Sequence, residues 1–328
     1  MKRPTRNDVA RLAEVSGWTV SQVLNGRSDV SITEATRARI HAAAEELGYR
    51  PNHTARALAT GNTHIVSLWA GRLSPFYALV LTHLRREAHG HGYRILISDI
   101  EESASPLASL GPVDGVIAVE HAEWAHNYLD QVNHMRMPFV SIGAYYLADT
   151  DYVGVDLNGG VRDAMDHLVA TGCRRIAYAC TGGDASGDEP RAVSYRSHRL
   201  GAGQPVEFID TCGSRAGARV GVREFVAAHG RPDAILCHND EQATGVYRGL
   251  RDLGLNVPDE VSLVGCDGIE EAEYLDRPLT TIVQPIEEMC ALGWAYLSAR
   301  MRNPALPPQH AVLRPRLSLR SSTRDVAV

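Results

Sequence analysis

The stretch NDVARLAEVSGWTVSQVLN, residues 7–25, predicts two short helices joined by a tight turn. Apolar side chains recur about one helical turn apart in each half, so the two helices can pack on each other. Ser16 is placed to cap the second helix, because its hydroxyl can accept a backbone N–H at the helix start. We expect Trp18, Ser21, Gln22 and Asn25 to point outward from the second helix. A helix with such a polar face fits the major groove of B-DNA, although an ordinary three-helix packing unit with a solvated face has the same pattern.

A third helix is expected from about Thr33 to Glu46, followed by the segment GYRPNHTARALATGNT at 48–63. Asn52 can cap a short helix in that segment. A helix of this length is too short to be stable alone in water. Leu58 has no core to join in a plain linker, whereas as an apolar wedge in the minor groove of DNA it would kink a base step. We therefore expect Leu58, together with the nearby Arg56, to contact DNA.

Charge is distributed unevenly along the 328 residues. The first 60 residues contain nine Lys and Arg against six Asp and Glu, and the remainder contains 24 against 33. A basic front on an acidic body suits a protein that meets phosphate groups at one end only. Six cysteines without CxxC spacing favour a reduced interior with no metal or other cofactor. The absence of an apolar leader or membrane-length run predicts a cytoplasmic protein with no membrane partner, and disfavours an exported solute-binding protein.

Beyond residue 64, short apolar runs alternate with amphipathic helices, which predicts parallel sheets covered on both faces. The expected strands fall into two sets, at 65–70, 93–100, 115–120 and 138–143, and at 175–180, 206–210, 234–240 and 262–267. Expected helices between them lie at 76–90, 159–171, 215–229 and 241–253. Two such sets indicate two doubly wound lobes.

Enzyme motifs are absent from the sequence. It contains no GxxxxGK[ST], no GxSxG and no HExxH, so a catalytic function is disfavoured. Serine, histidine and aspartate are numerous but scattered, so an α/β enzyme stays open as an alternative.

The stretch from Thr5 to Thr63 resembles the DNA-binding headpiece and hinge of the LacI/GalR family of bacterial transcription regulators. The runs that carry this resemblance are DVARLA, TVSQVLNG, TRARI, and ELGYRPN followed by ARALATG. The remaining chain resembles the family more loosely.

This resemblance implies an all-α helix-turn-helix headpiece followed by an α/β, periplasmic-binding-protein-like body of two doubly wound parallel-sheet lobes. The expected segments are a headpiece at 1–50, a hinge helix and linker at 51–63, and a body at 64–328 for effector binding and dimerisation. The chain is expected to cross between the lobes near 156, 282 and 305. Lobe 1 would then comprise about 64–155 and 283–304, and lobe 2 about 156–282 and 305–328.

Three positions of the second helix are those that the family uses most for base discrimination, namely Gly17, Trp18 and Gln22. Gln22 can pair bidentately with adenine, and the Trp18 ring could cover thymine methyl groups or, alternatively, pack on the first helix. Other polar side chains are expected to bind phosphates, which sets register without reading sequence. The complete set of expected DNA contacts is Thr5, Ser16, Gly17, Trp18, Ser21, Gln22, Asn25, Ser31, Asn52, Arg56 and Leu58.

Polar residues gather where the expected strands end, which is where open α/β sheets bind ligands. Aspartate and asparagine suit vicinal hydroxyls, and an aromatic face can stack on a sugar ring. The resemblance nominates five effector-binding residues, namely Phe76, Tyr77, Arg191, Asn239 and Asp267. For each, the alternative is a structural role, because a carboxylate at a strand end often caps the next helix and an aromatic side chain is often core.

Some positions depart from the family pattern. Gly268 and Cys266 replace an expected aspartate and aromatic residue, and 211–217 lacks an aromatic side chain. These departures argue against a simple hexose effector, and leave open another metabolite or a pocket that has lost its ligand. Glu14 occupies a turn position that is usually glycine, so a left-handed backbone there would be strained by about 1 kcal/mol.

Together these features predict a homodimeric transcriptional regulator, and more specifically a repressor. It would bind a pseudo-palindromic operator in double-stranded DNA, with affinity modulated by a small-molecule effector such as a sugar or a related metabolite. The alternatives are a cytosolic ligand-binding protein, an α/β enzyme and an effector-independent regulator.

Overall fold

The computed structural model describes residues 4–24, 31–50, 61–70, 74–99, 112–120, 137–146 and 148–325. The chain divides into two compact units, Met1–Thr63 and His64–Val328. Among the described residues, no helix is long and apolar enough to cross a membrane.

The described residues of the first unit form three helices, α1 (Arg6–Leu12), α2 (Gly17–Leu24) and α3 (Glu34–Glu46). Thr33 caps α3, since its Oγ1 accepts the backbone N–H of Thr36 at 3.3 Å. All three helices contribute to one buried apolar cluster, which consists of Val9, Ala10, Ala13, Val20, Val23, Ile40, Ala43 and Ala44. The periodicity of the sequence therefore predicted both the helices and the faces by which they pack.

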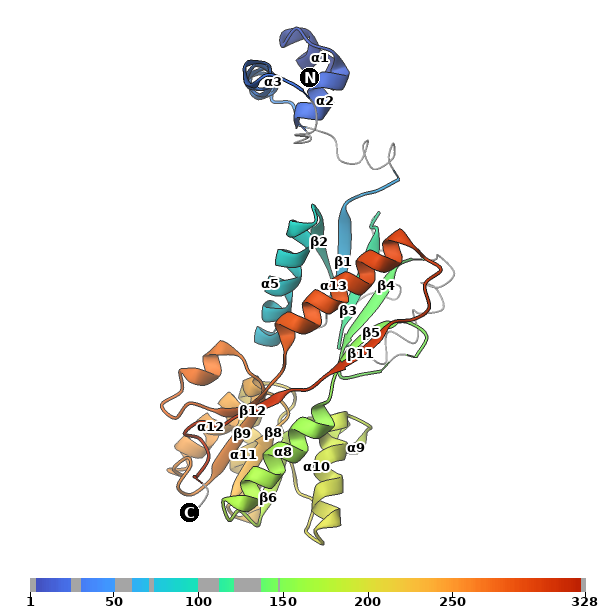
Figure 1. Ribbon diagram of the computed structural model, residues 1–328. Helices are drawn as coiled ribbons and strands as arrows, with labels where there is room; N and C mark the ends of the chain where they lie inside the picture. The colour runs from blue at the N-terminus through green and yellow to red at the C-terminus, as the bar shows by residue number, and fades with distance from the viewer. Residues whose placement is uncertain are drawn as a thin grey trace. The chain divides into compact units, whose positions relative to one another are not determined.

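The second unit contains two six-stranded sheets (Figure 1). The lobe 1 sheet has the order β11-β5-β4-β3-β1-β2, and the lobe 2 sheet has the order β12-β10-β9-β8-β6-β7. The lobe 1 strands are β1 (Ile65–Ala70), β2 (Arg94–Asp99), β3 (Gly115–Val119), β4 (Phe139–Gly143), β5 (Asp151–Val155) and β11 (His310–Leu313). The lobe 2 strands are β6 (Ile176–Cys180), β7 (Phe208–Asp210), β8 (Ala234–Cys237), β9 (Ser262–Asp267), β10 (Thr280–Val283) and β12 (Arg316–Ser318).

Pairing is parallel throughout both sheets except between β10 and β12. Central strands such as β3 and β9 are buried along their whole length, as expected for a parallel sheet covered on both faces. This confirms the two parallel-sheet lobes that the alternating pattern predicts.

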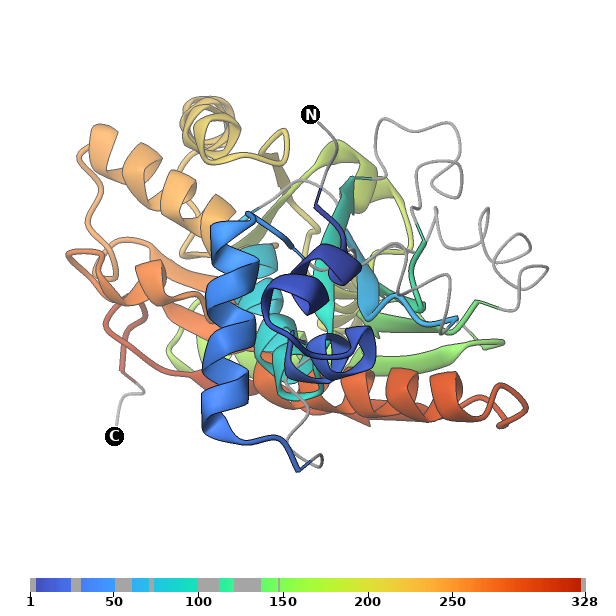
Figure 2. The same ribbon diagram turned by 90° about the horizontal axis from the view of Figure 1, so that it is seen from above.

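Helices cover the faces of both sheets. In lobe 1, α13 (Ile286–Arg302) packs against α5 (Pro75–Gly90) and across β3, β4 and β5, as Figures 1 and 2 show. The lobe 2 helices are α8 (Leu157–Ala170), α9 (Gly182–Ser186), α10 (Pro190–Gly201), α11 (Arg215–His229), α12 (Asp240–Asp252) and the 3-10 turn η1 (Glu270–Glu273).

The third passage of the chain between the lobes differs from the expected one. The described chain passes between lobes at Asp156, between β10 and α13, and between β11 and β12. The expectation of a crossing near 305 is wrong, because 305–313 stays with lobe 1. Strand β11 pairs in parallel with β5, and the Gln309 N–H donates to the buried Asp151 carboxylate at 2.8 Å. The chain returns to lobe 2 only at β12.

Candidate functional sites

The start of α2 is built as the sequence predicts. Ser16 Oγ accepts the backbone N–H of Thr19 at 3.1 Å and so caps the helix. Val20 and Val23 are buried on its inner face. Trp18 is 59% exposed, so most of its side chain is accessible and lies outside the buried core of the headpiece. The outer face of α2 therefore presents a large aromatic side chain at its first turn.

A cation that the sequence reasoning missed lies beside this face. Arg6 Nη1 donates a hydrogen bond to Ser21 Oγ at 3.4 Å. A Cβ atom at Gly17 would lie 3.2 Å from Arg6 Nε, so Gly17 leaves room for the arginine to lie close to α2. Arg6 directly follows Thr5, which was an expected DNA contact. This position in the sequence is the signal that could have identified Arg6. A guanidinium at this place suits a phosphate contact.

The remaining predicted DNA contacts differ in their surroundings, and some lie outside the described residues. Thr5 caps α1, since its Oγ1 accepts the Asp8 N–H at 3.4 Å while Asp8 Oδ2 accepts the Thr5 N–H at 2.9 Å. Ser31 is exposed, and Gln22 is half-buried on α2. Glu14 has a φ of 54°, which is the left-handed conformation expected at that turn. Four further predicted contacts, Asn25, Asn52, Arg56 and Leu58, lie outside the described residues, as does the expected hinge helix.

A cavity of about 180 Å³ lies where strands of both lobes end. Its lobe 1 side is formed by the start of α5 and by the residues after β3 and β4, and its lobe 2 side by α10 and the residues at the ends of β8, β9 and β10. The lining residues are Ser74, Phe76, Tyr77, Glu120, Tyr145, Arg191, His238, Asn239, Asp267 and Gln284. The structure thus brings all five nominated effector residues around one cavity.

Arg191 is buried, and Glu189 compensates its charge. Its Nε donates to Glu189 Oε1 at 2.6 Å, its Nη1 to the His238 carbonyl at 3.1 Å, and its Nη2 contacts His238 Nε2 at 2.9 Å. Glu189 Oε2 also accepts the Ala192 N–H at 2.8 Å, which caps α10. Burial and the Arg191 charge lower the pKa of His238 to about 4, so its neutral ring can accept the hydrogen bond from Arg191 Nη2. Most of the five arginine donors are therefore occupied within lobe 2.

Two carboxylates face the cavity from opposite lobes. Glu120 follows β3 with a φ of 55°, and Asp267 ends β9 with a φ of 118°, both in a region that side chains other than glycine rarely adopt. Glu120 Oε1 accepts the Ala144 N–H at 3.2 Å, and Asp267 Oδ1 accepts from Gln284 Nε2 at 2.8 Å. Burial raises the pKa of both carboxyls above their ordinary values.

The neighbouring Asn239 and Asp240 have different positions. Asn239 lines the cavity, but its Oδ1 caps α12 by accepting the Gln242 N–H at 2.8 Å. Asp240 points away and accepts the Gly268 and Ile269 N–H groups at 2.7 and 3.0 Å. Burial raises the pKa of Asp240 to about 7. Asp240 therefore has the structural role that we weighed as the alternative for strand-end carboxylates.

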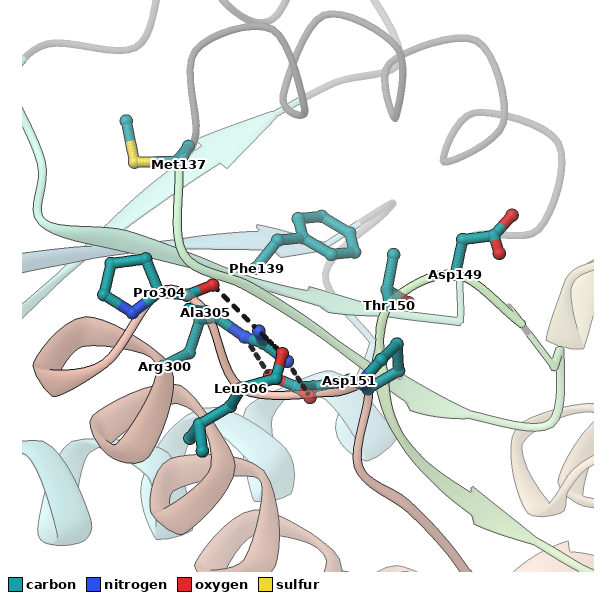
Figure 3. A pocket seen from close by; sticks show the side chains of 10 residues that line it. Met137, Phe139, Asp149, Thr150, Asp151, Arg300, Pro304, Ala305 and Leu306 are labelled. Atoms are coloured by element: carbon teal, nitrogen blue, oxygen red, sulfur yellow. Dashed lines mark hydrogen bonds and ion pairs between the residues drawn. The ribbon is translucent and has the colours of Figure 1, made fainter.

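A larger cavity of about 480 Å³ lies in lobe 1, at the amino ends of β4 and β5 (Figure 3). Arg300 crosses it, donating to Asp151 through Nε at 2.9 Å and Nη2 at 2.8 Å. The same guanidinium also donates to the carbonyls of Pro304, Leu306 and Pro307. Because these partners occupy its donors, Arg300 acts as a clamp on the chain after α13. The smaller cavity is the better candidate for ligand binding.

Comparisons with known proteins agree with this architecture. The family model for bacterial regulatory proteins of the lacI family matches residues 5–52, and that for a periplasmic binding protein-like domain matches 165–323. The ribose operon repressor of Escherichia coli strain K12 is 30% identical, over 97% of this chain and 99% of that protein. The transcriptional regulator CelR of Thermobifida fusca is 31% identical, over 98% of each chain.

Solved structures have the same fold. A complex of the transcriptional regulator CelR with cellobiose matches with a TM-score of 0.69 and 29% identity, covering 98% of this chain and 100% of that one. The Lac repressor dimer bound to operator and an anti-inducer matches with a TM-score of 0.81 over 98% of this chain and 99% of that one, at 24% identity. With the headpiece, the two lobes and these relatives in agreement, the chain belongs to the LacI family of bacterial regulatory proteins.

Proposed function

We propose that this protein is a transcriptional repressor that binds operator DNA through its headpiece and responds to a small effector in the cavity between its lobes. The observation that carries the DNA-binding part is the outer face of α2, where the exposed Trp18 stands beside Ser21 and Gln22 while Val20 and Val23 anchor the helix. Such a helix can enter the major groove with its first turns against base edges. The protein acts in the cytoplasm, where its operator lies, and its function requires no catalytic step.

Base readout is assigned to Trp18 and Gln22, and phosphate contact to Arg6, Ser16 and Ser21. A glutamine amide can donate to and accept from an adenine edge, and one good bidentate pair gives about 1–3 kcal/mol of discrimination. Phosphate contacts set the register and make affinity dependent on salt. The wedge assigned to Leu58 and the hinge helix stay predictions from sequence.

The functional form is a homodimer, so that two headpieces read a pseudo-palindrome. Strand β2 is at one end of the lobe 1 sheet, and its Leu96 and Ile97 are 40% and 42% exposed. Apolar side chains on an edge strand are suited to contact with a second copy. We infer that this edge contributes to the dimer, in line with the relative whose solved structure is a dimer on operator DNA.

The effector is assigned to the 180 Å³ cavity, because residues of both lobes line it. A relative is named a ribose operon repressor, and another was solved with cellobiose. Aromatic rings at Phe76 and Tyr77 and hydrogen-bonding groups at Asn239 and Asp267 suit a small polyhydroxylated molecule. A ligand that touches both lobes binds one lobe arrangement better than another, and this difference is what alters DNA affinity.

The test is selection of DNA fragments from the source genome with the full-length protein, followed by affinity measurement over a range of salt concentrations. We expect one enriched pseudo-palindromic sequence, bound with a steep salt dependence. Trp18→Ala should lose the enrichment, whereas Asp166→Asn, an exposed change in lobe 2, should retain it. Equal binding to random DNA by all three proteins would refute sequence-specific regulation and favour a ligand-binding protein.

A further inference from the structure

Several hydrogen-bond acceptors of the described residues face the 180 Å³ cavity. The Glu120 and Asp267 carboxylates approach from opposite lobes. Gln284 Nε2 donates one of its two N–H groups to Asp267, and Gln284 Oε1 is buried without a hydrogen-bond partner among the described residues. A buried acceptor without a donor is costly, so these oxygens favour a ligand that brings its own N–H and O–H groups.

Positive charge at the cavity is already compensated. Arg191 is the guanidinium in the lining, and its Nε lies 2.6 Å from Glu189 Oε1. Both side chains are buried, at 8% and 3% exposure. Other acidic groups lie nearby, since Asp184 Oδ2 is 3.7 Å from His238 Nδ1. An anionic ligand would therefore meet an arginine that already has a carboxylate partner, together with the negative charges of Glu120 and Asp267 when they are ionised.

Both carboxylates are held in unusual backbone conformations. Left-handed φ values at Glu120 and Asp267 persist only where the surrounding structure imposes them, and such residues cluster at ligand sites. Gly143, next to Ala144, leaves the space that the Glu120 carboxyl occupies, since a Cβ there would lie 2.7 Å from its Cδ. The fold thus aims a carboxylate from lobe 1 at the cavity in addition to the one from lobe 2.

We propose that this cavity binds a small polyhydroxylated amine in its ammonium form, of the size of an amino sugar, and discriminates against phosphorylated and carboxylated sugars. The ammonium group donates to Glu120 and Asp267, and the hydroxyls donate to Gln284 Oε1 and pair with Asn239 and the tyrosine hydroxyls. The cavity volume of about 180 Å³ lies below the range of drug-sized ligands and suits a monosaccharide. This inference rests on the proposed function, namely that the cavity is the effector site.

The test is isothermal titration of the full-length protein with D-glucosamine, D-galactosamine and D-mannosamine, against the parent hexoses and their 6-phosphates. At about pH 6.5 the amines are largely protonated, as α-amino groups are. We expect one amine to bind at least about tenfold more tightly than its parent hexose, which is about 1.4 kcal/mol, and no binding of the phosphates.

Two variants test whether the carboxyl groups of Glu120 and Asp267 cause the preference for the amine. Glu120→Gln keeps the shape of the side chain and should reduce the ratio of amine affinity to hexose affinity to about one. Asp267→Asn should act in the same direction, and Asp166→Asn, whose side chain is 74% exposed on α8, should bind like the wild type. Retained amine preference in both cavity variants would overturn the proposal.

The remaining outcomes separate this inference from the proposed function. A parent hexose or a 6-phosphate that binds as tightly as its amine overturns the amine assignment, yet leaves the cavity as the effector site. Failure of every sugar to bind, with operator binding intact, overturns the amine assignment and the effector role together, and leaves DNA binding standing. Failure of operator selection, by contrast, says nothing against amine binding.

Discussion

Replacement of Glu189 by glutamine should destabilise lobe 2 strongly. Glu189 Oε1 accepts from Arg191 Nε at 2.6 Å, and its Oε2 accepts the Ala192 N–H at 2.8 Å. Both members of the pair are nearly inaccessible to water, at 3% and 8% exposure. Glu189→Gln preserves the volume, removes the charge, and leaves one acceptor oxygen, which can accept from Arg191 or cap α10 but not do both.

The expected loss follows from two contributions. Removal of one partner of a buried ion pair typically lowers the free energy of unfolding by about 3–5 kcal/mol, because the other charge stays buried. Loss of the helix cap adds about 1 kcal/mol. Glu120 and Asp267 face the same guanidinium and take over part of its compensation, so we expect a total near the lower end of the summed range, about 4 kcal/mol.

The pKa of Glu189 also determines how the stability difference between the wild type and Glu189→Gln changes with pH. Burial alone would raise the pKa of Glu189, but Arg191, His238 and the Ala192 N–H together lower it below its ordinary value of 4.5. A lowered pKa stabilises the folded state above the ordinary value, and this contribution is lost as pH falls through the folded-state pKa. The wild type should thus exceed the variant in free energy of unfolding most at neutral pH, and the difference should shrink as pH falls below 4.5 and through the lowered pKa of Glu189.

Urea denaturation should be followed by a signal that reports lobe 2. The tryptophans are at positions 18, 69, 124 and 294, outside the lobe 2 segments, so tryptophan fluorescence reports the rest of the chain. Near-ultraviolet circular dichroism of the stacked Tyr178 and Tyr195, with ring centroids 5.2 Å apart, reports lobe 2. A loss below about 1 kcal/mol at neutral pH, or a difference independent of pH, would refute the assigned pairing. Asp166→Asn is the matched control, as an exposed carboxylate in the same lobe.

Three further substitutions test other parts of the molecule. Gln22→Ala should relax base preference at one operator position by about 1–3 kcal/mol, and an unchanged selection profile would contradict direct readout. Ser16→Ala should lower the stability of α2 by about 1 kcal/mol, seen as faster hydrogen exchange of its amides in the full chain, and unaltered exchange would argue against the cap. Arg300→Met leaves the Asp151 carboxylate buried without its cation, so the lobe 1 transition seen by tryptophan fluorescence should lose about 3–5 kcal/mol. An unshifted midpoint in that variant would mean that the clamp is not needed.

Local pattern was sufficient for much of the fold. The headpiece helices were predictable because apolar spacing, the Ser16 cap and the Thr33 cap all indicate the same boundaries. The long apolar strands, such as β1 and β9, were predictable because burial on both faces leaves a continuous apolar run. In these segments local preference and tertiary packing coincide.

Strands β5, β10, β11 and β12 were not predicted. Strand β11 has an exposed valine at its third position, and β12 contains three residues with a charged first one. Such short segments become strands through pairing with a neighbour that is distant in sequence, so the third passage between lobes was misplaced. Helix α13 was not among the expected helices either, although its buried residues at 286, 289, 290, 293, 294 and 297 follow helical spacing.

Some residues that line the candidate cavity could be predicted from the sequence, but the interactions between the side chains around it could not. The rule that ligands bind at strand ends placed Asn239 and Asp267, yet it could not show that Asp240 points away. The pairing of Glu189 with Arg191 could not be predicted, because residues two apart on a helix do not face each other. Glu189 is the residue before the helix, so its side chain turns back over the first turn.

The charges in the cavity connect ligand specificity to lobe movement. Glu120 belongs to lobe 1 and Asp267 to lobe 2, and the charge of Glu120 adds to the larger effect of burial in raising the pKa of Asp267. When both are ionised they repel each other across the cavity, which opposes a closed arrangement of the lobes. An ammonium between them reverses this effect, whereas a neutral sugar does not. A ligand changes a conformational equilibrium only by its differential affinity for the two states. A cation bridging these carboxylates therefore supplies, through one contact, both the selectivity of the site and the free energy that changes DNA affinity.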